Sequence, residues 1–425
     1  LALFAALLVP VTYIHPYLFS KWKREVMSRG ILRAQGIFKV LQEVFSHIHL
    51  VKALGREKYE MKRFELNLQK RVETELKNAK VSQVGSFSSS VLQKIISGII
   101  ALYGGYQVIR GTMTLGSLTA IMIYLTQFIG YLKSVGELYQ ITVVNSVVRS
   151  RLAEILDIRP HIYDAEDAGP YHIKKGTVEF REVYFGYKEN NLVLRNMSFL
   201  VEPQAKIALV GLSGSGKTTI LYLILRLYQQ QKGAVFIDGV DTRKIKLESL
   251  KSQVSIALQD SLLWNDTIMN NISYGAESAT GDDVIRAAQL AHAHDFIMKL
   301  SNQYDSVIGE RACKISEGQK QRIAVARTLI RKPKVLILDE AMSSLDSETE
   351  DKIVDNIKKE FKDSTAIIVS HRLSTVKKMD FVYFLENPGK MDIGTHSSLL
   401  LQNKNYRELF ASQIEEGVSV DGYPA

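Results

Sequence analysis

The fold of this chain is decided by the stretch Ile207-Ala208-Leu209-Val210-Gly211-Leu212-Ser213-Gly214-Ser215-Gly216-Lys217-Thr218. Its opening residues form a short, continuous apolar run, which is typical of a buried parallel strand. The residues from Gly211 onward match the glycine-rich P-loop pattern G-x-x-x-x-G-K-[ST] in full. The stretch therefore predicts a strand, a loop that cradles phosphates, and a helix beginning near Lys217.

The P-loop residues predict the chemistry of a nucleotide site. Glycines let the backbone curl so that its N–H groups point at phosphates, and the helix N-terminus adds positive potential. We expect Lys217 to reach the β- and γ-phosphates and the Thr218 hydroxyl to bind Mg²⁺. The residues assigned to the nucleotide here are Gly211, Ser213, Gly214, Ser215, Gly216, Lys217, Thr218 and Thr219. The alternative is a chance glycine-rich turn.

A second apolar run, Val335–Leu338, ends in Asp339-Glu340. A carboxylate at the C-terminal edge of a strand beside a P-loop can hold Mg²⁺, usually through water. The next residue, Glu340, is then placed to polarise an attacking water as a general base. An Asp-Glu pair alone is a weak signal for a metal and catalytic site. Together with the P-loop it is a strong one.

The sequence Ile-Ser-Glu-Gly-Gln-Lys-Gln-Arg, residues 315–322, opens a predicted helix that runs to about Lys332 and ends at Pro333. Ser316 followed three residues later by Gln319 is a capping-box pattern. The same N-terminus can also offer the Ser316 hydroxyl and backbone N–H groups to a phosphate. Both interpretations are compatible with the sequence.

Strand-like and helical segments alternate through the second part of the chain. Val178–Phe185 and Val193–Val201 are predicted strands, and Ala366–Val369 is another buried parallel strand. We therefore predict an α/β domain with a mainly parallel core sheet and an antiparallel edge.

The first part of the chain has the pattern of a helical membrane domain. Leu1–Phe19, Val91–Ile109 and Leu115–Leu132 are apolar runs near the length of a membrane span. Between them, residues 20–82 show helical spacing of apolar and charged residues, which predicts long amphipathic helices. The alternative is a set of buried helices in a large soluble domain.

The two parts of the chain differ in net charge. Residues 1–150 contain 19 Lys and Arg against 8 Asp and Glu, a net charge of +11, whereas the rest of the chain carries −2. Positive charge beside apolar spans is typical of cytoplasmic flanks of membrane helices. No nucleic-acid-binding module accompanies this charge, so no nucleic-acid partner is expected.

Taken in order, the P-loop, the Ser-x-Gly-Gln-x-Gln-Arg motif, the Asp-Glu pair and Ser370-His371-Arg372 resemble the ATP-binding cassette (ABC) family. The resemblance covers residues 177–412. Met113–Gly116 and Glu43–Glu57 extend it, because they look like the rear half of an exporter-type transmembrane domain.

Two further segments, Asn265–Ile268 and Asp305–Glu310, are similar to those of bacterial lipid and multidrug flippases.

The resemblance implies roles for residues outside the P-loop. Tyr187 resembles the aromatic residue that stacks on adenine; otherwise it is an ordinary strand-end tyrosine. Gln259 resembles the glutamine that contacts Mg²⁺ and the attacking water; otherwise it is a surface residue. His371 resembles the switch histidine at the γ-phosphate, and Asp346 lies in a loop similar to the one joining two ATP sites. Glu43–Ala53 resembles a coupling helix.

The resemblance also implies a partner. ATP in this family lies between two cassettes, so Ser316, Gly318 and Gln319 of one chain face the P-loop of another. We expect a second half-transporter, in a homodimer or heterodimer, within membrane lipid. The predicted function is ATP hydrolysis driving export or flipping of an amphipathic substrate across a bacterial inner membrane, with the cassette in the cytoplasm. Alternatives are a regulatory half with weakened hydrolysis and a soluble-type ABC ATPase.

The predicted segments are a partial transmembrane domain at 1–150, a linker at 151–176, the cassette at 177–415 and a tail at 416–425. Two features depart from the family pattern. Glu317 stands where the family usually has glycine, which places a carboxylate near the partner's γ-phosphate. The predicted membrane helices correspond only to the rear half of the family's membrane domain, so we interpret the chain as N-terminally truncated. The sequence leaves the substrate and the choice of homodimer or heterodimer open.

Overall fold

The computed structural model describes residues 36–158, 160–188, 191–212, 214–276, 278–309, 315–387 and 389–418. They form two compact units, of which the first ends at residue 159 and the second begins at Pro160. Two sequence predictions, the span Leu1–Phe19 and the phosphate contact of Ser213, lie outside the described residues.

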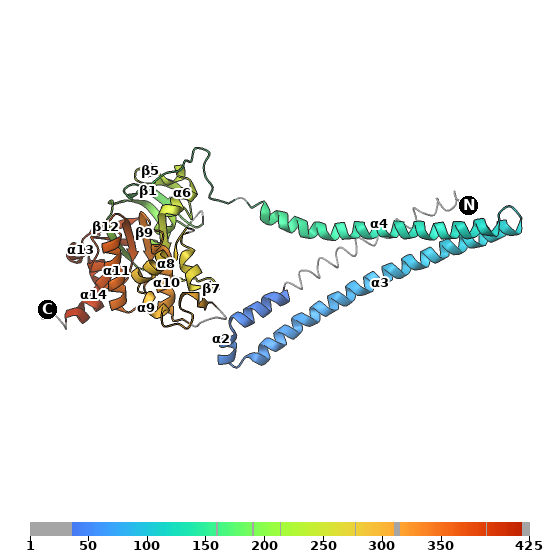
Figure 1. The fold of residues 1–425 in the computed structure, drawn as a ribbon, viewed down its shortest axis with the longest axis horizontal. Coiled ribbons are helices and arrows are strands. Elements are labelled where there is room, and N and C mark those ends of the chain that lie inside the picture. Colours follow the sequence, from blue (N-terminus) through green and yellow to red (C-terminus); the bar gives the residue numbers. More distant parts are fainter. Residues whose placement is uncertain are drawn as a thin grey trace. The chain divides into compact units, whose positions relative to one another are not determined.

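The described part of the first unit is helical. Residues 36–46 form a helix, and α2 (Ile48–Ala53), α3 (Glu57–Ile109) and α4 (Leu115–Leu156) follow (Figure 1). Gly111, with a φ of +75°, lies in the tight turn between α3 and α4. The Thr114 hydroxyl then caps α4 by accepting a hydrogen bond from the backbone N–H of Ser117 at 3.2 Å.

Helices α3 and α4 lie together at their joined ends and diverge away from the turn between them (Figure 1). Ile96 and Ile100 of α3 form a small buried cluster with two apolar residues of α4, Leu125 and Ile129. Among the described residues, α3 alone is long and apolar enough to cross a membrane, and Leu115–Tyr131 of α4 is a shorter apolar segment. The predicted spans Val91–Ile109 and Leu115–Leu132 thus occupy the joined ends of the two helices.

The second unit is built on a six-stranded sheet. Its strand order is β12 (Lys390–Gly394), β11 (Phe381–Asn387), β3 (Lys206–Gly211), β10 (Thr365–Val369), β9 (Val335–Asp339) and β6 (Val254–Ala257). All neighbours pair in parallel except β12, which is antiparallel to β11 at the edge. The predicted mainly parallel sheet with an antiparallel edge is confirmed.

A second, antiparallel sheet has the order β2 (Leu194–Val201), β1 (Val178–Phe185), β4 (Lys232–Ile237) and β5 (Val240–Asp241). The predicted strands Val178–Phe185 and Val193–Val201 belong to this separate sheet. Sequence periodicity predicted the strands themselves but carried no information about which strand pairs with which.

The remaining described elements of the unit are α5 (Lys217–Ile224), η1 (Thr242–Lys244), α6 (Leu247–Gln253), β7 (Asp266–Thr267), α7 (Ile268–Ser273), α8 (Gly281–Leu290), α9 (His294–Ile297), η2 (Gln303–Asp305), β8 (Val307–Ile308), α10 (Glu317–Leu329), α11 (Ser347–Glu360), α12 (Leu373–Lys377), α13 (His396–Gln402) and α14 (Lys404–Val418).

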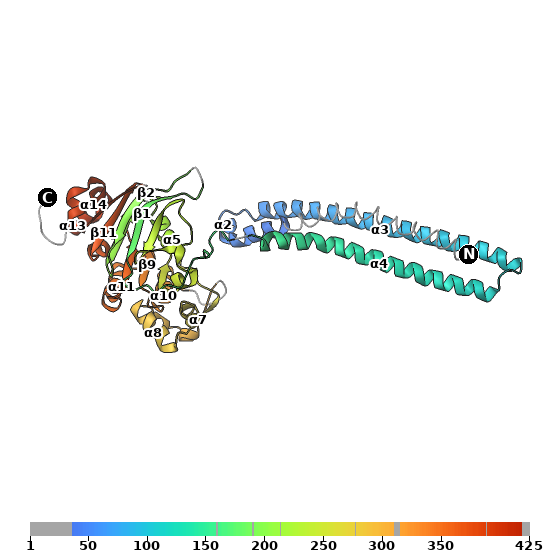
Figure 2. The same cartoon turned by 90° about the horizontal axis from the view of Figure 1, so that it is seen from above.

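The core sheet separates two hydrophobic cores. Ile207 and Leu209 of β3 pack with the antiparallel sheet and α5, whereas Ala208 and Val210 pack with the helices of the opposite face, including α8, α10 and α11 (Figure 2). Because both faces are covered, every residue of β3, β9 and β10 is buried. This explains why these strands are continuous apolar runs rather than alternating ones.

Candidate functional site

The P-loop has the backbone that its glycines allow. Gly214 and Gly216 have φ values of +78° and +108°, in the left-handed region that favours glycine, and Gly216 is the N-cap of α5. At Gly211 a Cβ atom would lie 2.5 Å from the carbonyl oxygen of Leu385. The loop therefore reaches the N-terminus of α5 only with these small residues.

Two buried side chains at the P-loop carry hydrogen-bond donors. The Lys217 ammonium donates to the carbonyl oxygens of Gly211 at 2.8 Å and Leu212 at 3.0 Å. Burial lowers the pKa of Lys217, and the nearby charges of Glu340 and Asp339 oppose that shift. The Ser215 hydroxyl is buried without a partner among the described residues. A ligand rich in acceptor oxygens, such as a polyphosphate, fits this donor set.

The predicted metal ligands Thr218 and Asp339 are neighbours. Asp339 is buried at the end of β9, and its burial raises the pKa of its carboxyl group, whereas a hydrogen bond from Thr218 lowers it. No group of three or more His, Cys, Asp or Glu residues in the described ranges is arranged to hold a metal ion. This pair fits Mg²⁺, which commonly takes one or two protein ligands and completes its shell with phosphates and water.

Gln259, the other predicted metal contact, is exposed just beyond the end of β6. Strand β6 pairs in parallel with β9, so Gln259 and Asp339 follow neighbouring strands at the same edge of the sheet. No hydrogen bond joins the two side chains among those of the described residues.

Glu340 and His371 meet at the same edge. Glu340 follows β9 and His371 lies just after β10, and these strands are parallel neighbours. The Nε2 atom of His371 lies 3.0 Å from Oε1 of Glu340. Glu340 has a φ of +48°, a left-handed conformation that is strained for a residue with a side chain. The structure therefore brings the predicted general base and the predicted switch histidine into contact.

Tyr187 lies against the P-loop helix. Its hydroxyl is 3.0 Å from the Thr219 hydroxyl, and its ring packs edge-on against Tyr228 with 5.0 Å between centroids. Phe185 makes a similar edge contact with Tyr187 at 5.1 Å. Half of Tyr187 remains exposed. Sequence reasoning missed Tyr228, which lies well along the chain from Tyr187 and joins it only through the fold.

The predicted capping box of α10 is present. The backbone N–H of Gln319 donates to the Ser316 hydroxyl at 3.3 Å, and the backbone N–H of Ser316 donates to Oε1 of Gln319 at 2.9 Å. At Gly318 a Cβ atom would lie 3.0 Å from the carbonyl oxygen of Ser344. Among the described residues, no hydrogen bond or ion pair joins Ser316–Gln319 to the P-loop cluster. The helix terminus Ser316–Gln319 therefore shares no hydrogen bond with the P-loop residues that the structure describes.

An ion pair between a buried glutamate and a partly exposed arginine, which sequence reasoning missed, supports the loop before α11. Glu350 is almost fully buried, and its Oε2 atom lies 2.8 Å from Nη1 of Arg372. Arg372 also donates to the carbonyl oxygens of Ser343 at 3.1 Å and Leu345 at 2.5 Å. Asp346, which ends this loop, caps α11 by accepting from the backbone N–H of Thr349 at 2.8 Å. The residue next to His371 therefore holds the loop that contains Asp346.

Comparison with known proteins agrees with this geometry. Residues 194–343 match the family described as ABC transporter, and residues 1–132 match the ABC transporter transmembrane region. The ATP-dependent lipid A-core flippase of Syntrophus aciditrophicus is 35% identical across 98% of this chain and 69% of its own length. The chain belongs to the ABC exporters. As an ABC exporter half-transporter it binds ATP and couples ATP hydrolysis to transport across a membrane, with the cassette on the cytoplasmic side.

Other relatives of this ABC exporter are described differently. The mitochondrial iron-sulfur clusters transporter ABCB7 of Danio rerio is 37% identical over 82% of this chain and 47% of its own length. The solved structure of a bacterial Atm1-family ABC exporter with ATP bound has a TM-score of 0.91 and 29% identity, covering 96% of this chain and 72% of that one. The predicted family and fold are confirmed, and the transmembrane match argues against the soluble-type ATPase alternative.

Proposed function

We propose that this ABC exporter hydrolyses Mg-ATP at sites shared by two cassettes and uses the cycle to export or flip an amphipathic molecule across a bacterial inner membrane. The observation that carries the proposal is the cluster of Lys217, Thr218, Asp339, Glu340 and His371 at one edge of the core sheet.

Nucleotide binding is assigned to the P-loop and Tyr187. The backbone N–H groups of the loop, the Ser215 hydroxyl and the Lys217 ammonium donate to phosphate oxygens, and α5 adds the positive end of its dipole. The half-exposed ring of Tyr187 offers a surface for the adenine. The Ser213 contact predicted from the sequence is part of the same assignment.

Hydrolysis is assigned to Glu340, which takes a proton from the attacking water as a general base. His371, in contact with Glu340, orients that carboxylate and donates toward the γ-phosphate. Thr218, Asp339 and Gln259 would hold Mg²⁺, which neutralises developing phosphate charge when it is bound.

A second cassette completes each site in this proposal. Ser316, Gly318 and Gln319 share no hydrogen bond with the P-loop cluster of their own chain within the described ranges, which is what a site shared between two chains requires. Asp346 and its loop would face the opposite site. The partner is a second half-transporter, identical or different.

The substrate class rests on the flippase relatives. Lipid A-core flippases of Syntrophus aciditrophicus and of Desulfotalea psychrophila are each 35% identical over nearly the whole of this chain, which favours an amphipathic substrate and a bacterial membrane.

Glu317 motivates the alternative of a regulatory half. Its Oε2 atom lies 3.0 Å from the Lys320 ammonium, which offsets its charge and favours an active site.

The deciding experiment replaces Glu340 with glutamine in the purified full chain. Glu340→Gln removes the base but keeps the shape, so Mg-ATP binding should persist while the ATPase rate falls by about 100-fold or more. The matched control is Glu348→Gln, which changes an exposed glutamate of α11 paired with Lys352. Normal turnover in Glu340→Gln would refute the general-base assignment, and loss of Mg-ATP binding would refute the claim that Glu340 acts only on the water.

A further inference from the structure

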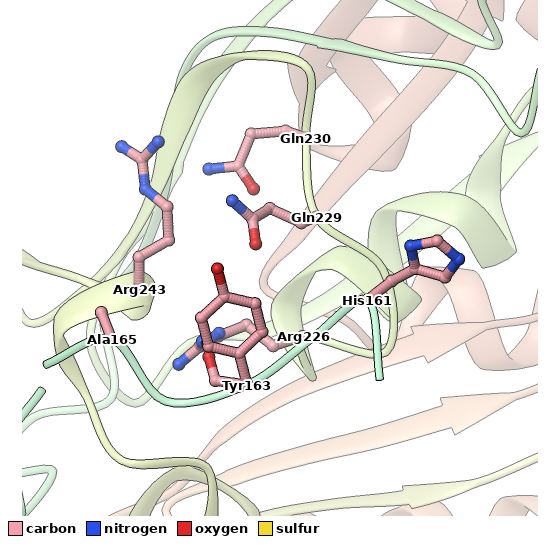
Figure 3. Close-up of a pocket in the computed structure, with 7 residues that line it drawn as sticks. All are labelled: His161, Tyr163, Ala165, Arg226, Gln229, Gln230 and Arg243. Carbon is pink, nitrogen blue, oxygen red and sulfur yellow. The ribbon is translucent and has the colours of Figure 1, made fainter. Parts of the chain in front are cut away.

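The cavity of about 430 Å³ beside the C-terminal end of α5 has both of its arginines satisfied. Figure 3 shows Arg226 and Arg243 among the side chains that line it. Arg243 is paired with Asp241, and the Arg226 guanidinium donates to three backbone carbonyl oxygens. This cavity therefore presents no free guanidinium group to a ligand. A polar contact with consequences for ATP turnover lies instead at α14.

The side-chain amide of Gln413 joins α14 to the backbone that follows β10. Its Nε2 atom donates to the carbonyl oxygen of His371 at 2.9 Å, and its Oε1 atom accepts from the backbone N–H of Leu373 at 2.9 Å. A carbonyl oxygen can only accept and a backbone N–H can only donate, so these partners fix the orientation of the amide. Gln413 therefore holds the main chain on both sides of Arg372.

The sequence of α14 places Gln413 on the face that packs against the core. Tyr406, Phe410 and Gln413 follow one another at helical spacing, so they lie on the same side of the helix. Tyr406 and Phe410 are buried, and the Tyr406 ring packs edge-on against Phe384 of β11 with 5.4 Å between centroids. Gln413 is partly buried one turn further on. The amide therefore extends from a helix whose position is fixed by buried aromatic contacts.

The two hydrogen bonds of Gln413 have different consequences. Leu373 is the first residue of α12, and the N-cap residue of that helix, Arg372, makes no side-chain cap. The Gln413 carbonyl thus accepts from an N–H group that the helix itself leaves unpaired, which is an ordinary structural role. The bond to the His371 carbonyl has another effect, because it fixes the backbone that carries the switch histidine. Among the hydrogen bonds of the described residues, Gln413 is the only partner of that carbonyl.

The residues on either side of His371 are held from another direction. The Ser370 hydroxyl donates to Glu350 of α11 at 3.3 Å, and Arg372 binds the loop before α11. The His371 side chain itself is 45% exposed, so packing alone does not fix its direction. Its Nε2 atom nevertheless lies 3.0 Å from Oε1 of Glu340. The backbone position set by Gln413 therefore bears directly on this contact.

We propose that Gln413 is a positioning residue for ATP hydrolysis, which holds the main chain of His371 so that the imidazole faces Glu340. The inference rests on the role of His371 in the proposed function and deepens it. It also makes the docking of α14 on the core a condition for full turnover.

The variant Gln413→Glu separates the two hydrogen bonds in the purified full chain. At about pH 8 its carboxylate still accepts from the Leu373 N–H and suits the N-terminus of α12, but it has no N–H group for the His371 carbonyl. We expect kcat for ATP hydrolysis to fall about tenfold, and KM for Mg-ATP to stay within about twofold because the P-loop is unchanged. The unfolding temperature should remain that of the unmodified chain.

Gln413→Met, which loses both hydrogen bonds at a similar side-chain length, should lower kcat similarly and also lower the unfolding temperature. The matched controls are Gln289→Glu and Gln289→Met, which change an exposed glutamine of α8 and should leave turnover unchanged. The positioning role is overturned if Gln413→Glu keeps normal kcat, if its defect lies in KM, or if it is as unstable as Gln413→Met.

The variant His371→Ala, assayed in parallel, tests the proposed function separately. It should lose nearly all turnover. If it does so while Gln413→Glu turns over normally, Gln413 only caps α12 and the proposed function stands. Normal turnover in His371→Ala would overturn the assigned role of His371, and this inference with it.

Discussion

At the residue scale, Glu317 places a carboxylate in the first turn of α10, where the proposed shared site would bring a triphosphate. The ion pair between Glu317 and Lys320 is exposed on both sides, so it contributes little to stability. The pair matters instead because the Lys320 charge offsets the charge of Glu317. With Lys320 beside it, the carboxylate adds little net negative potential to the site.

We therefore predict that Lys320→Gln lowers the ATPase rate several-fold, because it leaves the Glu317 charge uncompensated near the nucleotide. The double variant Lys320→Gln with Glu317→Gly should recover most of the loss. Steady-state ATPase assays on both variants and on Glu317→Gly alone complete a double-mutant cycle. Equal rates in Lys320→Gln and the unmodified chain would show that the pair has no electrostatic role in turnover.

A second prediction at this scale concerns the hydroxyl of Tyr187. Tyr187→Phe keeps the ring and its edge contacts with Phe185 and Tyr228 but loses the hydrogen bond to Thr219. A neutral hydrogen bond contributes about 0.5–1.5 kcal/mol, so ATP affinity should fall by roughly two- to tenfold. Tyr187→Ala should weaken binding further. Fluorescent-nucleotide titration measures the ATP affinity of both variants. Unchanged affinity in Tyr187→Phe would show that the ring of Tyr187, and not its hydroxyl, contributes to ATP binding.

At the element scale, β4 approaches β1 so closely that its second residue, Gly233, must be glycine. A Cβ atom on Gly233 would lie 2.3 Å from the carbonyl oxygen of Glu182 and 2.4 Å from that of Arg181. Gly239, in the turn after β4, has nearly the same positive φ but open space around its Cβ position. The two glycines therefore separate the cost of backbone conformation from the cost of a clash.

We predict that Gly239→Ala costs about 1 kcal/mol of unfolding free energy, the usual cost of left-handed backbone for alanine. Gly233→Ala should cost several kcal/mol, because β4 must also move away from β1. Thermal unfolding of the full chain compares the two variants. Equal losses would mean that the sheet absorbs the extra methyl group without strain.

At the scale of the whole molecule, Asp238 fastens the start of the cassette to its antiparallel sheet. Its carboxylate accepts hydrogen bonds from the backbone N–H groups of Lys174 at 2.7 Å, Lys175 at 2.9 Å and Thr177 at 2.9 Å. Nearby, Ile173 is fully buried. Residues that the sequence placed at the end of a linker are therefore part of the second unit and are held against its antiparallel sheet.

These hydrogen bonds to the Asp238 carboxylate should make the unfolding free energy depend on pH. Burial alone would raise the pKa of Asp238, but the hydrogen bonds from Lys175, Thr177 and Lys174 outweigh it and lower the pKa below the ordinary 3.8. A lowered folded-state pKa gives stability that is present above the ordinary pKa and is lost as pH falls through the folded value.

We predict that Asp238→Asn lowers the unfolding free energy by about 1–2 kcal/mol at pH 7, because the amide replaces a charged acceptor of several bonds. Asparagine tolerates the left-handed backbone at this position, so conformation is not the cause. Denaturant unfolding between pH 7 and pH 3 measures the gap, which should shrink below about pH 4. A gap that stays constant over this range would exclude the carboxylate charge as its source.

The sequence by itself determined the family, the parallel core strands, the P-loop with its helix, and the capping box of α10. Each of these is written within a few consecutive residues, where backbone freedom, apolar periodicity and capping chemistry act locally. Only the tertiary structure decided the contacts between Glu340 and His371, between Tyr187 and Thr219, and between Glu350 and Arg372, as well as the separate antiparallel sheet. Those pairs are 31, 32 and 22 positions apart. They meet because of strand order and packing, which no local pattern specifies.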